Sequence, residues 1–335
     1  MYDPNHKNFN HLEFDDNARK LMSLIDTQNW ADLITFYRQL HPSERHHAID
    51  CCSYFIKTDK DVGCEDRPEP ELKILLGGIY ARRAFITRGF GRGDEVEEEQ
   101  WLKAQNLSAR AQEFLDAAIQ KTPEDTAIYG FYILADLLSG FTEPEDGDPY
   151  KDHNKVDKCV QLIKASTQPP NIFAAQALNL YDSPKWFGSI DRLEETANDF
   201  INTAPNAAWM GIKAQALYEI WYWHVAFEED KKVRQDFFNT LDSAPYKKEL
   251  EDLQAIFLKD SQNPTIPEIE KIFAHNHFAN LFSRLTFFKQ ARPHLQAMDK
   301  KAMYYPWSLG IPYGKTYSTI NTHRLKSFML PIRFS

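Results

Sequence analysis

The sequence predicts an all-α fold in which antiparallel helical hairpins stack as a solenoid, followed by an irregular aromatic C-terminal tail. In most segments apolar residues recur at the three- to four-residue spacing of one helix face, and strict two-residue alternation is scarce. The chain has only 13 glycines, too few for a fold rich in tight β turns. Its 18 prolines fall mostly between the periodic segments, where they interrupt helices.

The N-terminal half shows the helical spacing in three segments. A first helix face is formed by Trp30, Leu33, Ile34, Tyr37 and Leu40. A second is formed by Leu107, Ala111, Phe114, Leu115 and Ala118, and the turn at 123–125 ends it. A partner helix then begins, with Ile128, Phe131, Ala135 and Leu138. The last two segments resemble one tetratricopeptide-type hairpin, so we expect the solenoid to be tetratricopeptide-like.

The C-terminal half continues in the same way. Ser189 is a favourable N-cap for a helix whose apolar face holds Ile190, Leu193, Ala197, Phe200 and Ile201, and Pro205 closes it. Further apolar faces follow in the segments 209–227, 250–257 and, after Pro267, from 269 onward. Because short polar turns join these segments, consecutive helices are expected to pack as antiparallel neighbours.

Three stretches lack the helical period. Residues 57–70 are charged and contain two prolines, which predicts a loop, and the acidic, turn-rich stretch 141–154 divides the chain. We therefore expect an N-terminal helical half (1–140), a C-terminal helical half (155–302) and an irregular aromatic tail (303–335) packed on the helices. One continuous domain is the alternative.

Composition restricts the partners. The formal net charge of −9 is unfavourable for nucleic acid and for anionic lipid, and it suits a basic protein partner. No apolar run approaches the roughly 20 residues that span a bilayer, and the N-terminus does not resemble a secretion signal. These features predict a cytoplasmic protein with neither a nucleic-acid nor a membrane partner. The four cysteines show no disulfide framework.

Two blocks carry a family resemblance. The first runs from Ala81 through an Arg88-Gly89 turn to Val96 and Trp101; the second is Ser-Pro-Lys-Trp-Phe-Gly-Ser at 183–189. Together they resemble an uncharacterised family of bacterial helical domains over roughly residues 75–230. The resemblance implies a helical, tetratricopeptide-like fold and brings no activity with it.

Motifs that bear chemistry have simpler structural interpretations. The glycine-rich turn at 89–93 lacks a preceding strand, and acids that would repel phosphate follow it: Asp94, Glu95, Glu97, Glu98 and Glu99. These acids would complement a helix dipole instead.

Metal and cofactor sites are not predicted. His47 and Cys51 share a helix face as half of a zinc site, but the spacing to Cys52 and Cys64 matches no zinc finger, so we expect no metal and no cofactor. His275 and His277 point to different faces, which predicts two exposed or capping histidines. A nucleophile triad stays open, since its members need not be close in sequence.

The leading functional hypothesis is a protein-binding helical repeat protein, most specifically a cytoplasmic bacterial immunity protein that neutralises a basic toxin by binding and occlusion. The expected contact residues are the five acids at 94–99, together with Trp221 and Trp223 if exposed. Lys185 and Trp186 are expected to fix a turn, with Trp186 in the core. The alternatives are a scaffold or regulator and an enzyme whose active site no sequence motif reveals. Such a site would lie near the tail residues Tyr304, Tyr305, Trp307, Tyr313 and Tyr317.

Overall fold

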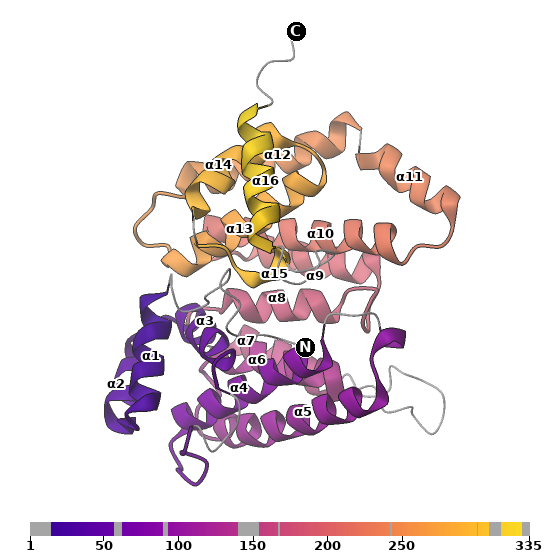
Figure 1. Cartoon of the computed structure of the whole chain (residues 1–335). Coiled ribbons are helices and arrows are strands. Elements are labelled where there is room, and N and C mark those ends of the chain that lie inside the picture. The colour runs from indigo at the N-terminus through magenta and orange to yellow at the C-terminus, as the bar shows by residue number, and fades with distance from the viewer. Residues whose placement is uncertain are drawn as a thin grey trace. The chain divides into compact units, whose positions relative to one another are not determined.

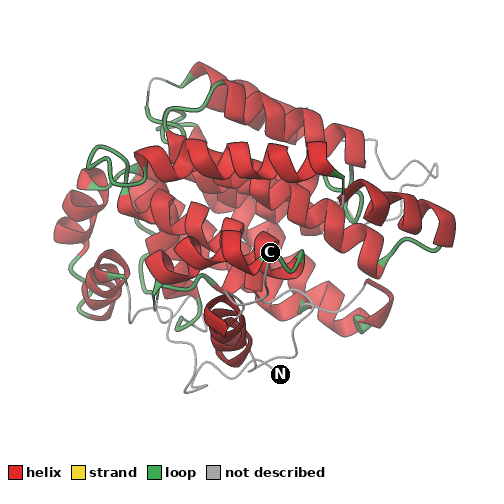
Figure 2. Cartoon of the chain, turned by 90° about the horizontal axis from the view of Figure 1, so that it is seen from above, coloured by secondary structure: helices red, strands yellow, loops and turns green. Residues whose placement is uncertain are grey.

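The computed structural model describes residues 15–56, 62–89, 93–139, 154–166, 168–241, 243–299, 301–307 and 316–329. Within these ranges every regular element is a helix and no strand occurs, which confirms the all-α prediction (Figure 2). The helices group into two compact units, Met1–Tyr181 and Asp182–Ser335 (Figure 1).

The first unit is built around one central helix, α6. Its helices are α1 (Asp16–Asp26), α2 (Trp30–Gln39), α3 (Pro42–Ser53), α4 (Pro70–Arg88), the short 3-10 helix η2 (Gly93–Glu95), α5 (Glu98–Ile119), α6 (Ala127–Ser139), α7 (Asn154–Ala165) and α8 (Ile172–Tyr181). Helix α6 contacts α3, α4, α5, α7 and α8, and every residue from 127 to 138 is buried. A helix that is apolar on all sides belongs in the interior, which explains this position.

Two adjacent glycines let α4 approach its neighbours closely. A Cβ on Gly77 would lie 2.5 Å from Leu115 of α5, and a Cβ on Gly78 would lie 2.7 Å from Phe131 of α6. Only glycine fits between these helices, because both contacts are shorter than real Cβ atoms tolerate.

The second unit is built around α10 and α13. Its helices are α9 (Ile190–Asn202), η3 (Ala207–Trp209), α10 (Met210–Ala226), α11 (Lys231–Leu241), α12 (Ala244–Asp260), α13 (Glu268–Arg284), α14 (Phe288–Met298), α15 (Tyr304–Trp307) and α16 (Thr316–Met329). All residues at 208–220 and 273–283 are buried, and α13 contacts both α10 and α14. Gly211 permits the α10–α13 crossing, since a Cβ there would lie 2.8 Å from the Ala274 Cα.

Most of the expected helices are confirmed. The segment at Trp30 is α2, the pair around Pro123 is α5 and α6 in contact with each other, and α10, α12 and α13 occupy the later apolar segments. Ser189 is the N-cap of α9, and its side chain accepts a hydrogen bond from the Arg192 N–H at 3.1 Å. Residues 62–69 form no helix, as expected, while 57–61 lie outside the described residues.

The prediction of an irregular tail is wrong for Thr316–Met329. These residues form α16, which contacts α14 and α15, so the expectation that the tail packs on helices holds for this segment (Figure 1). The helix was missed because its apolar side chains do not repeat at a clear helical spacing; contact with α14 supplies the packing that the local pattern lacks.

The division between the units also differs from the expected position. Residues 141–153 of the expected boundary lie outside the described residues, and α7 begins directly afterwards. Helices α7 and α8, which the sequence assigned to the C-terminal half, contact α6 and belong to the first unit. An acidic, turn-rich stretch therefore does not mark the point at which the packing changes.

Candidate functional site

The acidic residues expected to bind a partner lie at the η2–α5 corner of the first unit. Glu95 ends η2, and Glu97, Glu98 and Glu99 form the N-cap and first turn of α5. All four side chains are exposed, while the side chain of Asp94 lies outside the described residues. Glu99 pairs with Lys103 one turn later at 2.6 Å, an exposed pair that adds little stability.

Three side chains hold the start of α5 against the end of α4. The Gln100 amide donates to the carbonyls of Thr87 at 2.7 Å and Arg88 at 3.0 Å. The Trp101 indole N–H donates to the Gly93 carbonyl at 3.3 Å, and the Arg88 guanidinium lies 5.0 Å from the Trp101 ring. The end of α4 and the start of α5 are therefore fixed together, and the acids extend from a braced corner.

An apolar side chain stands among these acids. Leu102 of α5 is 58% exposed and follows Glu98 and Glu99 at the i+4 and i+3 positions of the same helix face. An exposed apolar residue bordered by acids has the composition of a small contact patch with a charged rim. We call Glu97, Glu98, Glu99 and Leu102 the acidic corner.

Trp221 and Trp223 lie on α10 in the second unit and are half-buried. Trp221 packs against the core, stacks on Tyr218 at 5.8 Å and receives the Arg284 guanidinium at 5.8 Å from its ring. Trp223 stacks on Phe227 at 5.4 Å. Trp221 and Trp223 are expected to contact a partner only if they are exposed. They are exposed only in part, because packing within the chain already covers much of both rings.

The second sequence block forms the expected turn between α8 and α9. The Trp186 and Gly188 N–H groups both donate to the Ser183 carbonyl, at 3.0 and 3.3 Å. Lys185 forms an ion pair with Glu219 of α10. The expectation that Trp186 packs into the core is wrong: Phe187 is the buried aromatic, and Trp186 is half-buried.

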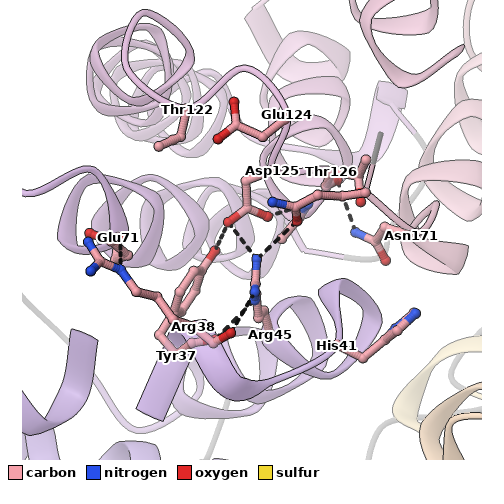
Figure 3. Close-up of polar contacts among 12 residues, drawn as sticks. Tyr37, Arg38, His41, Arg45, Glu71, Thr122, Glu124, Asp125, Thr126 and Asn171 are labelled. Atoms are coloured by element: carbon pink, nitrogen blue, oxygen red, sulfur yellow. Dashed lines mark hydrogen bonds and ion pairs between the residues drawn. The ribbon is translucent and has the colours of Figure 1, made fainter. Parts of the chain in front are cut away.

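A buried ion pair organises the first unit. Arg45 of α3 donates to the Asp125 carboxylate at 2.9 Å, and Tyr37 of α2 donates its hydroxyl to the same carboxylate at 3.0 Å (Figure 3). Asp125 also accepts the Ala127 N–H at 3.1 Å at the start of α6. Burial raises the pKa of Tyr37 well above its usual value, so its phenol stays protonated and donates. The network is structural, since its polar groups satisfy one another.

Three side chains with metal-binding atoms converge where α1 meets α3. The ligand atoms of Asp15, His47 and Cys51 all lie within 4.8 Å of one another. The sequence identified His47 and Cys51 but not Asp15, which precedes α1 and is remote in the chain. Burial raises the pKa of the Cys51 thiol well above its usual value, which is unfavourable for a thiolate nucleophile.

The region proposed for a hidden enzyme site is a buried polar cluster. Tyr305 donates to the Glu219 carboxylate, which also pairs with Lys185. The Glu219 side chain is 0% exposed and that of Lys185 is 12% exposed. Trp307, also 0% exposed, donates its indole N–H to Asn276 at 2.9 Å. Tyr313 and the side chains of Tyr304 and Tyr317 lie outside the described residues.

The expectation of exposed histidines on α13 is wrong. His275 and His277 are both buried, and burial lowers their pKa values to about 4 and about 3. The Nδ1 atoms of His275 and His294 lie 3.0 Å apart, and the Gln254 side-chain amide nitrogen lies 3.0 Å from the His294 Nε2. Both faces of α13 are interior, which helical spacing alone did not indicate.

The remaining sequence features have structural roles. Gly89 follows helix α4 rather than a strand and takes a φ of 78°, and residues 90–92 lie outside the described residues. The preceding strand that a phosphate loop requires is therefore absent at this turn. All four cysteines are unpaired and buried. Among the described residues, no helix combines the length and the apolar character needed to cross a bilayer.

Comparison with known proteins adds no assignment. No family model matches the chain, and neither a curated protein nor a solved structure shows significant similarity. Membership of the bacterial helical family suggested by the two sequence blocks stays a prediction.

Proposed function

We propose that this chain acts by binding another protein through the acidic corner. The carrying observation is the placement of Leu102, an exposed apolar side chain, among three exposed glutamates on a braced helix start. A rigid patch loses little conformational freedom on binding, and a central apolar contact with a charged rim is common in protein interfaces.

The partner in this proposal is basic. Exposed carboxylates attract a positively charged surface and increase the rate of association, an effect that falls as salt screens the charges. The net charge of −9 acts in the same direction over the whole molecule.

The most specific form of the proposal is a cytoplasmic immunity protein that neutralises a cognate toxin by occluding it. A toxin that acts on nucleic acid presents a basic surface, which the acidic corner complements. In this proposal the tetratricopeptide-like α5–α6 hairpin presents the corner, and α5 supplies its contact face.

The enzyme alternative has less support from the side chains. The histidines of α13 and the carboxylate of Glu219 are buried; His275 contacts His294, and Glu219 accepts the hydroxyl of Tyr305. The cluster at Tyr305 therefore serves the interior of the second unit in this proposal. A scaffold or regulator would use the same acidic corner and differ only in its partner.

The test begins with affinity capture from a lysate of the source organism at low salt, followed by purification of any stoichiometric partner. Binding is then titrated for the wild type and for the triple variant Glu97→Lys/Glu98→Lys/Glu99→Lys. The matched control is Glu249→Lys/Glu251→Lys/Asp252→Lys on α12, which makes the same charge change at exposed positions of the second unit.

We expect the first triple variant to lose at least about tenfold in affinity, with a weaker salt dependence, while the control stays near the wild type. If the captured partner is a toxin, stoichiometric addition of this chain should abolish its activity. Equal affinities for the two triple variants, or no partner at low salt, would contradict the proposal.

A further inference from the structure

Asp15, His47 and Cys51 place three zinc-type ligand atoms around one point. Asp15 is the N-cap of α1, whereas His47 and Cys51 are one turn apart on α3. The His47 Nε2 lies 3.4 Å from the Asp15 Oδ2 and 3.4 Å from the Cys51 Sγ. Carboxylate oxygen, imidazole nitrogen and thiolate sulfur are the three donors that proteins use for Zn²⁺.

The two separations from the His47 nitrogen match those of a tetrahedral zinc site. With Zn–S near 2.3 Å and Zn–N and Zn–O near 2.0–2.2 Å, tetrahedral angles place sulfur and nitrogen about 3.5 Å apart and nitrogen and oxygen about 3.4 Å apart. Both observed separations are 3.4 Å, and the sulfur–oxygen separation lies within 4.8 Å.

The arrangement differs from a nucleophile triad. In a triad the nucleophile and the carboxylate contact opposite nitrogens of the histidine, so that one nitrogen takes a proton while the other is held. Here Asp15 and Cys51 both approach the same nitrogen, Nε2. Three donors converging on one point favour a shared cation over a proton relay.

Neighbouring contacts orient the donors. The Oδ1 of Asp15 accepts the Ala18 N–H at 2.9 Å, which turns Oδ2 toward His47. The His47 ring stacks on Phe173 at 5.6 Å. Cys51 is buried, while the side chains of His47 and Asp15 are 15% and 16% exposed, so an ion can enter from the solvent side. Such supporting contacts are a regular feature of metal sites.

Charge also fits a divalent cation. One carboxylate and one thiolate balance Zn²⁺, so the occupied site carries no net charge at a half-buried position. Cys52 is not a ligand in this arrangement, because its thiol donates to the Ala18 carbonyl at 3.5 Å.

We propose that Asp15, His47 and Cys51 bind Zn²⁺, with water in the fourth position, and that the ion fastens α1 to α3. This inference is independent of the acidic corner, which lies on other helices.

The test uses full-length protein stripped of metal with a chelator and titrated with Co²⁺ and then with Zn²⁺. We expect one equivalent of Co²⁺ to bind and to give a thiolate-to-cobalt charge-transfer band, which Zn²⁺ removes by displacement. Zn²⁺ should also raise the thermal unfolding midpoint, because it binds the folded state.

Variants assign the ligands. Cys51→Ala should lose the charge-transfer band, and His47→Gln and Asp15→Asn should each weaken Zn²⁺ binding by about 100-fold or more, beyond the effect of a supporting contact. Asn at position 15 keeps the N-cap and removes the charge. Cys52→Ala, the matched control on the neighbouring thiol, should bind as the wild type does.

Absence of stoichiometric binding by the wild type, or a charge-transfer band that survives in Cys51→Ala, would overturn the proposal. If Cys51→Ala does not fold, His47→Gln decides the matter: unchanged Zn²⁺ affinity in that variant would be equally contrary to the assignment.

Discussion

Arg45 and Asp125, 80 residues apart in the sequence, are joined by a buried ion pair of 2.9 Å. Arg45 also donates to the carbonyls of Tyr37 at 3.0 Å and Arg38 at 3.1 Å, near the end of α2. One guanidinium therefore links the end of α2, the body of α3 and the start of α6 (Figure 3).

Replacing Arg45 by Met should lower the free energy of unfolding by about 3–5 kcal/mol, because it leaves the Asp125 carboxylate buried without its cation. Urea denaturation followed by circular dichroism at pH 7 measures this. Lys103→Met, which removes an exposed pair in the same unit, should cost under about 0.5 kcal/mol. Equal stability of the two variants would contradict the structural role of the pair.

Acidification should destabilise the protein at pH values well above those at which carboxylates titrate. Burial lowers the pKa of His46 and of His277 to about 3 each, so both are neutral in the folded state. Because their unfolded pKa is near 6.5, their stabilisation is complete above that pH and is lost as the pH falls toward 3. At pH 5 each histidine should lower the unfolding free energy by about 2 kcal/mol.

The measurement is the unfolding free energy at pH 7, 6 and 5. His277→Gln should show a shallower dependence than the wild type, because one buried site no longer excludes a proton. A flat profile between pH 7 and pH 5 would show that these histidines are not buried in solution.

Gly188→Ala should destabilise the second unit by at least about 2 kcal/mol. A Cβ at this position would lie 2.0 Å from the Asp182 carbonyl oxygen, so the turn before α9 would have to open. Gly93→Ala is the matched control, since nothing lies within 4 Å of its Cβ position. Thermal unfolding of both variants measures the difference, and similar midpoints would be inconsistent with the described turn.

Leu102→Ala should reduce the affinity for the partner by roughly fivefold to tenfold, the loss of about 1 kcal/mol expected for a small apolar contact. Its effect on folding should stay within about 0.5 kcal/mol, because the side chain is 58% exposed. Leu325→Ala on α16, where the leucine is 61% exposed, serves as the control. Unchanged binding in Leu102→Ala would remove this residue from the interface.

Local pattern predicted the elements better than it predicted burial. The faces that form α2, α9 and α10 are visible because the apolar residues repeat, and Ser189 is recognisable as an N-cap from its residue type. The burial of His275 and His277 was missed, since α13 is enclosed on several sides and helical spacing then carries no information about exposure.

The sequence by itself determined the helical class, most helix positions and the acidic character of the η2–α5 corner, because each follows from neighbouring residues and the period of one helix. Only the tertiary structure decided that α6, α10 and α13 are central and that Thr316–Met329 form a helix against α14. It also brought Asp15 to His47 and Arg45 to Asp125. These relationships depend on how helices distant in the sequence pack together. The local sequence around one residue does not indicate which distant residue it contacts.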